Sequence, residues 1–143
     1  HMSKKTIKKL FFDLLQKCNS ISRKIIKYHG VLDKEKISSL LSKTDIIILP
    51  TFYKTEAVPL SIIEAMRSGN AVITTNHNLL HHVFSNKNGH IISPQSREEL
   101  INAFLKLVVD DNKLLEIRTN NIAFAKNKFN PKNHITQVKG LLN

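Results

Sequence analysis

Two glutamates on either side of a predicted helix start are the residues whose type and spacing best suit ligand binding. Glu56 lies in a loop, Pro59 suits the first turn of a helix, and Glu64 follows about one turn into it. A helix start offers unpaired backbone N–H groups and a partial positive charge, which favour a phosphate or diphosphate. Carboxylates flanking this point suit a ligand that is anionic in the middle and rich in hydroxyls at both ends, as a nucleotide-sugar is.

The segment before this loop is predicted to be a buried strand. Asp45 precedes three isoleucines, Leu49 and Pro50, a continuous run typical of a strand buried on both faces of a parallel sheet. Ligands of open parallel sheets bind beyond the carboxyl ends of the strands. The loop at 51–58 is therefore the expected site.

Strands and helices are predicted to alternate along the chain. The predicted strands are 25–28, 46–49, 71–75 and 91–92, the predicted helices are 3–17, 34–42, 59–66, 97–109, 113–128 and 132–142, and 77–83 is a turn with a short helix. Asp33 and Ser96 are expected helix caps, with Glu99 at the capping-box position. This alternation predicts an α/β fold, a Rossmann-like parallel sheet flanked by helices.

Length and composition predict a single domain. The chain has 143 residues, of which 41% are apolar, enough for one core over residues 3–143. His1 and Met2 look like the remnant of a cleaved expression tag. Cys18 is the only cysteine, which excludes an internal disulfide and favours the cytosol. No apolar run approaches the ~20 residues that a membrane-spanning helix needs.

The net charge of +11 predicts an anionic partner or surface. Only 6% of the residues are aromatic and no RNP, zinc-finger or helix-turn-helix pattern is present, so nucleic acid is not the expected partner. The lysines within residues 3–17 would favour peripheral contact with an anionic membrane at its cytoplasmic face. Most other lysines are expected to form a solvated surface.

Three segments of the sequence resemble one enzyme family. Residues 44–50 read TDIIILP, residues 56–66 read EAVPLSIIEAM, and residues 68–75 read SGNAVITT. They closely resemble the E-x7-E region of retaining GT-B glycosyltransferases of glycosyltransferase family 4, and the resemblance covers most of the chain from about residue 29. It implies that the chain is the nucleotide-sugar donor-binding, C-terminal domain of such an enzyme.

The resemblance also implies roles for individual residues. Glu64 would accept hydrogen bonds from the ribose hydroxyls, and Glu56 would lie by the transferred sugar as the catalytic-site residue. The backbone against the diphosphate would be that of Ala57, Val58, Pro59 and Leu60. The full-length enzyme would be a hexosyltransferase of polysaccharide biosynthesis that uses a UDP- or GDP-sugar, needs no cofactor, and transfers the sugar with retention to a glycan or lipid-linked acceptor.

The sequence departs from the family pattern in two loops. Ala57-Val58 replaces a common Gly-Phe pair, and Asn78-Leu79 and His81-His82 replace Gly-Gly and Pro-Glu. His77 and His81 have i, i+4 spacing, but no nearby Asp, Glu or Cys completes a tetrahedral set. We therefore expect a solvent-exposed histidine cluster and no metal.

The first two strands of the family's donor domain, with the Arg and Lys that contact the diphosphate, are not recognisable in these 143 residues, and neither is an acceptor-binding N-terminal GT-B domain. The fragment alone is therefore expected to be inactive. The missing strands would lie between 25–28 and 46–49. We expect either a rearranged four-strand sheet or a homodimer in which Phe11, Leu14 and Leu15 cover exposed apolar surface.

Two alternatives stay open from the sequence. A nucleotide-sugar epimerase of GT-B fold would bind the same donor. A non-enzymatic nucleotide-binding or nucleic-acid-binding module is supported only by the charge.

Overall fold

The computed structural model describes residues 27–51, 58–76 and 80–130. The chain divides into two compact units, His1–Lys36 and Ile37–Asn143. Helix α3 (Lys34–Leu41) begins after Asp33, whose Oδ1 accepts the Lys36 backbone N–H at 2.9 Å, which confirms the predicted cap. The predicted strand at 25–28 lies partly outside the described residues, and it is wrong for Lys27 and Tyr28, which are not in a strand.

Three parallel strands form the described sheet, in the order β1 (Ile46–Leu49), β2 (Ala71–Thr75) and β3 (Gly89–Ile92). The register pairs Ile46 with Ala71 and Val72 with Gly89. Every residue of β2 is buried, as expected for the central strand of a sheet covered on both faces. The parallel α/β architecture predicted from the sequence is confirmed.

Strand β1 is less buried than its sequence predicts. It lies at an edge of the described sheet, and Ile48 is 42% exposed. The prediction that this strand is buried on both faces is therefore wrong. Among the described residues, no strand pairs with the outer side of β1. The rearranged four-strand sheet is likewise not found in the described part. The predicted dimer contacts through Phe11, Leu14 and Leu15 lie outside it.

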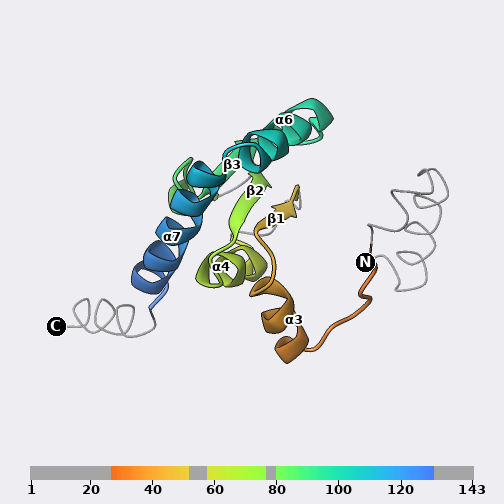
Figure 1. Ribbon diagram of the computed structural model, residues 1–143, viewed down its shortest axis with the longest axis vertical. Coiled ribbons are helices and arrows are strands. Elements are labelled where there is room, and N and C mark those ends of the chain that lie inside the picture. The colour runs from red at the N-terminus through yellow and green to blue at the C-terminus, as the bar shows by residue number, and fades with distance from the viewer. Residues whose placement is uncertain (1–26, 52–57, 77–79, 131–143) are drawn as a thin grey trace, which may run out of the picture. The chain divides into compact units, whose positions relative to one another are not determined.

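Helices α4 (Leu60–Arg67) and α6 (Arg97–Val108) cover opposite faces of the sheet (Figure 1). Because successive strand residues point to opposite faces, Val72 packs in the cluster on the α4 side, and Ala71 and Ile73 pack in the cluster on the α6 side. The helix residues buried against the sheet are Ile62, Ala65 and Met66 from α4, and Ala103 and Leu107 from α6.

Helix α7 (Asp111–Lys128) crosses the amino-terminal edge of the sheet. Its Asn121 Nδ2 donates to the carbonyls of Asn70, at 2.7 Å, and Asn88, at 2.9 Å, the residues just before β2 and β3. Arg118 donates to the carbonyl of Gly69 at 2.9 Å and pairs with Asp45, just before β1. Since α7 occupies this edge, the carboxyl edge is the one at which a ligand can approach the strand ends.

The Ser96 cap of α6 is confirmed, but the partner of the Glu99 side chain and the start of α7 differ from those predicted. Ser96 accepts the Glu99 N–H as expected, but the Glu99 carboxylate accepts the backbone N–H of Ser93 at 2.6 Å, where a capping box would bond Ser96. Helix α7 begins before the predicted residue 113, because the Asp110 side chain accepts the Lys113 N–H. Strand β3 is longer than predicted, and α5 (Leu80–Val83) is short. No helix in the described ranges has the length and apolar character needed to span a membrane.

Candidate functional site

Polar groups of the last two residues of β2 and of the residue after it join the three strand ends at the carboxyl edge. The buried Thr74 hydroxyl donates to the carbonyl of Leu49 at 3.0 Å, and the buried Thr75 hydroxyl donates to the carbonyl of Thr51. The Asn76 N–H donates to the carbonyl of Ile92 at 2.8 Å. These bonds satisfy the carbonyls at the ends of β1 and β3 and at the start of the loop after β1. They hold in place the edge of the sheet where the candidate loop begins.

Helix α4 begins at this same edge. It leads from the loop after β1 to Gly69, just before β2, so its first residue lies beside the carboxyl ends of the strands. Pro59, with φ −60° and ψ 128°, precedes the first helical residue and supplies no side-chain cap. The predicted helix start is confirmed to within one residue. An N-terminus without a side-chain cap presents its partial positive charge to the loop.

Glu64 lies on the solvent side of α4. Its side chain is exposed, as are those of Leu60 and Ser61, the neighbours one turn earlier on the same helix face. The opposite face of α4 is buried against the sheet. Glu64 can therefore accept hydrogen bonds from hydroxyls of a ligand whose anionic group lies near the helix start.

The described structure brings together four of the six predicted site residues. Val58 is half-buried, Pro59 is buried and Leu60 is exposed at the start of α4, with Glu64 one turn further on. Glu56 and Ala57 lie outside the described residues, so their roles stay predictions from the sequence.

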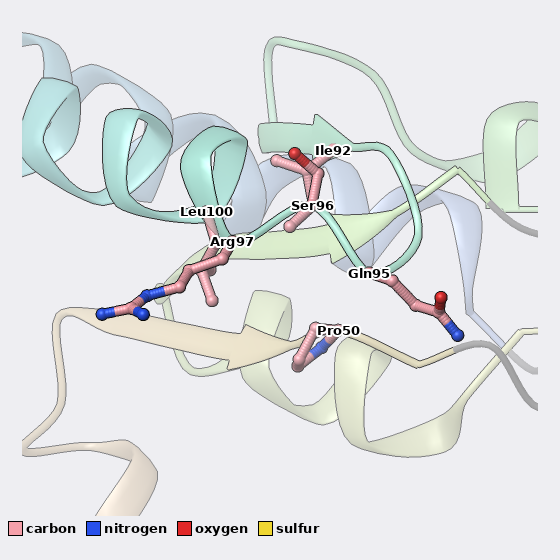
Figure 2. A pocket seen from close by; sticks show the side chains of 6 residues that line it. All are labelled: Pro50, Ile92, Gln95, Ser96, Arg97 and Leu100. Atoms are coloured by element: carbon pink, nitrogen blue, oxygen red, sulfur yellow. The ribbon is translucent and has the colours of Figure 1, made fainter.

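A small hollow at the carboxyl edge was not predicted from the sequence. It has a volume of about 240 Å³ and is lined by Pro50, Ile92, Gln95, Ser96, Arg97 and Leu100. Figure 2 shows Pro50 just past the end of β1 and Gln95 in the loop between β3 and α6. Pro50 and Pro94, which follow the two outer strands β1 and β3 of the described sheet, are the sequence signal that could have indicated it. Its size suits part of a ligand rather than a whole one.

The described side chains do not gather into a metal site. No group of three or more His, Cys, Asp or Glu among them has metal-binding geometry. The predicted histidine cluster around His77 and His81 lies outside the described side chains.

A parallel sheet with helices on both faces and a helix start at its carboxyl edge defines a Rossmann-like α/β domain. HepE from Anabaena, in complex with UDP-glucose, matches with a TM-score of 0.79 and 20% identity over 98% of this chain and 37% of its own. Sucrose-phosphate synthase from Thermosynechococcus elongatus matches with a TM-score of 0.79 and 23% identity over 94% and 33%. The fold is therefore that of the C-terminal half of a GT-B glycosyltransferase. This chain spans about a third of the length of both proteins.

A third similar structure is itself a C-terminal domain. That of the glycosyl transferase group 1 family protein LpcC from Francisella tularensis has a TM-score of 0.62 and 24% identity over 73% of this chain and 52% of its own. No curated protein matches the chain. Residues 14–126 match the family described as glycosyl transferases group 1. The chain belongs to this family.

Proposed function

We propose that this chain is the donor-binding part of a glycosyltransferase. The complete enzyme transfers a hexose from a UDP- or GDP-sugar, with retention, to a hydroxyl of a glycan or lipid-linked acceptor in polysaccharide biosynthesis. Family membership supports the enzyme class. The UDP-glucose bound to the similar HepE supports a nucleotide-sugar as the ligand.

The position of Glu64 is the observation that carries the proposal. Its exposed carboxylate lies one turn into α4, whose first turn has no side-chain cap and lies at the carboxyl edge of the sheet. A diphosphate against the helix start would leave the ribose hydroxyls within reach of Glu64. A charge-assisted hydrogen bond of this kind contributes about 1.5–3 kcal/mol.

The remaining site residues have complementary roles in this proposal. The backbone from residue 57 to Leu60 contacts the diphosphate, and Glu56 binds hydroxyls of the transferred sugar. Departure of the nucleoside diphosphate is helped by electrostatic stabilisation of its developing charge. The acceptor hydroxyl attacks from the same face, so no enzyme carboxylate acts as a nucleophile.

Binding of nucleotides by the purified chain tests the proposal. Titration calorimetry or ligand-detected NMR would compare UDP, GDP, UDP-glucose and a nucleoside without phosphate. We expect weak binding of at least one diphosphate that is reduced by Glu64→Ala and unchanged by Glu35→Ala, a matched exposed glutamate in the first turn of α3. Binding that Glu64→Ala does not weaken would contradict the assigned role of this residue.

The two alternative functions give different results in such measurements. An epimerase would convert the donor sugar without an acceptor. A nucleic-acid-binding module would bind DNA or RNA with a steep dependence on salt and would not respond to nucleotide-sugars.

A further inference from the structure

Helix α4 ends in a left-handed turn at Gly69, which has φ +78°. The next residue, Asn70, donates its backbone N–H to the carbonyl of Ala65 at 3.0 Å. A turn of this kind satisfies carbonyls of the last helical turn through backbone bonds. The carbonyl of Gly69 itself is bound by a side chain of another helix, because Nε of Arg118 in α7 donates to it at 2.9 Å.

Helix α7 approaches this turn closely. The two helices pack against each other (Figure 1), and a Cβ on Gly69 would lie 3.0 Å from Cδ1 of Ile122, one turn after Arg118. Because Gly69 has no side chain, the guanidinium of Arg118 can reach the backbone of α4. Its positive charge lies at the end of α4 where the helix dipole is negative, which favours the contact.

The same guanidinium also binds the residue just before β1. Nη1 of Arg118 donates to Oδ1 of Asp45. The Arg118 side chain is 33% exposed and the Asp45 side chain 63% exposed, so the charge attraction of this pair alone contributes little to stability. What the pair adds is a fixed point, since Arg118 joins the end of α4 to the start of β1.

Strand β1 and helix α4 are the two elements that carry the candidate loop. The chain enters the loop from the carboxyl end of β1 and leaves it at Pro59, where α4 begins. With four residues in β1 and eight in α4, each element is about 12–13 Å long, so a rotation at one end moves the other. Core packing holds one face of α4 against the sheet. The link through Arg118 adds a second constraint, at the ends of both elements that lie away from the loop.

We propose that Arg118 is a positioning residue for the donor site. Through Gly69 and Asp45 it sets the orientation of the start of α4 relative to β1. It lies at the amino-terminal edge of the sheet, so it is out of reach of a ligand at the carboxyl edge. Loss of both bonds is expected to displace the helix start and to weaken the binding of a diphosphate there. The inference rests on the proposed function for the identity of the ligand.

Three variants of the chain test the proposal. Arg118→Met removes both bonds and keeps an unbranched apolar stem. Asp45→Asn removes the charge of one partner and keeps the bond to Gly69. Lys113→Met breaks an exposed ion pair with Glu116 within α7 and is the matched control. Thermal and urea unfolding of each variant define conditions in which every chain is fully folded.

The first measurement needs no ligand. It compares the backbone amide NMR signals of Leu60 and Ser61, at the start of α4, among the folded chains. We expect Arg118→Met to shift these signals, Asp45→Asn to shift them less and Lys113→Met to leave them unchanged. A merely structural role would lower the free energy of unfolding without moving them, because they belong to the far end of α4. Unchanged signals in folded Arg118→Met overturn the proposal.

The second measurement is calorimetric titration with UDP and with GDP. We expect Arg118→Met to raise the Kd of the bound diphosphate about three- to tenfold, the scale of one hydrogen bond, and Lys113→Met to leave it unchanged. Wild-type affinity in folded Arg118→Met overturns the proposal. Shifted amide signals in a chain that binds neither diphosphate support the positioning of α4 by Arg118 and contradict the proposed function.

Discussion

Asn88 and Asn121 are joined by two hydrogen bonds, one between their side chains and one from the Asn121 side chain to the Asn88 backbone. Asn88 Nδ2 donates to Asn121 Oδ1 at 2.8 Å, and Asn121 Nδ2 donates to the Asn88 carbonyl at 2.9 Å. Both residues are buried, and Asn121 also holds the carbonyl of Asn70. One side chain of α7 therefore fixes the starts of two neighbouring strands.

Replacement of Asn121 is expected to destabilise the fold strongly. Asn121→Ala leaves buried polar groups of Asn70 and Asn88 without their partner, which costs about 2–4 kcal/mol of unfolding free energy. Urea denaturation measures the change. Asn120→Ala, at the exposed neighbouring position, is the control and should alter the unfolding free energy by less than about 0.5 kcal/mol. Equal effects at the two positions would contradict the role of Asn121.

Gly89 is expected to tolerate no side chain. Its φ is +147°, and a Cβ would lie 1.9 Å from the backbone oxygen of Val72 in the adjacent strand. Gly89→Ala therefore forces β2 and β3 apart and costs at least about 2 kcal/mol. Gly30 also has a positive φ, but a Cβ there would have no atom within 4 Å. Gly30→Ala should cost only about 1 kcal/mol, and thermal unfolding of both variants would reveal the difference.

Stability is expected to fall as the pH decreases below 6.5, the ordinary pKa of histidine. Partial burial, together with the positive charge of Lys106, lowers the pKa of His90 below its ordinary value of 6.5. The unfolded chain therefore takes up a proton at this residue before the folded chain does. The stability contributed by neutral His90 is complete above pH 6.5 and is lost as the pH falls through the lower pKa of the folded state. His90→Gln should flatten this part of the curve of unfolding free energy against pH, and an unchanged slope would show that His90 does not contribute.

The two glutamates are expected to affect different kinetic constants in a full-length enzyme that contains this domain. Glu64→Ala should weaken nucleotide-sugar binding by about 1–3 kcal/mol, through loss of hydrogen bonds to the ribose. Glu56→Ala should lower kcat more than it lowers nucleotide affinity. Steady-state kinetics together with direct binding separates the two effects. Wild-type binding and turnover in both variants would show that the pair is wrongly assigned.

The isolated chain is expected to transfer no sugar. Catalysis needs an acceptor held in line with the donor, and in enzymes of GT-B fold this requires the second domain. A radiolabelled donor incubated with the chain and a panel of glycan and lipid-linked acceptors provides the measurement. Any labelled product that depends on the chain would refute the expectation.

Much of the fold follows from local sequence signals. Strands 46–49 and 71–75 were predicted with their observed bounds, because short β-branched runs end at turn residues. The exposure of β1 was not predicted, since an apolar run does not reveal how many neighbours its strand has. Asn121 and Arg118 could not be recognised either, because their partners are distant in sequence.

The candidate site was predictable only in part. The helix start after Pro59 and the exposed Glu64 follow from short-range patterns. The hollow beside Pro50 could not be predicted from such patterns, because Leu100 and Arg97 line it only once α6 is packed on the sheet. The resemblance to the family was recognised from the arrangement of three sequence motifs. Charge and composition alone did not distinguish an enzyme from a nucleotide-binding or nucleic-acid-binding module.

The parallel pairing of all three strands has a consequence for the rate of folding. No described strand is joined to its neighbour by a hairpin, and β1 pairs with β2 only after α4 has been placed between them in the chain. Closing such connections costs chain entropy before any ladder forms, so folding is slower than that of a helical bundle of equal length. We therefore expect the assembly of β1, α4 and β2 to limit the refolding rate, after individual helices have begun to form.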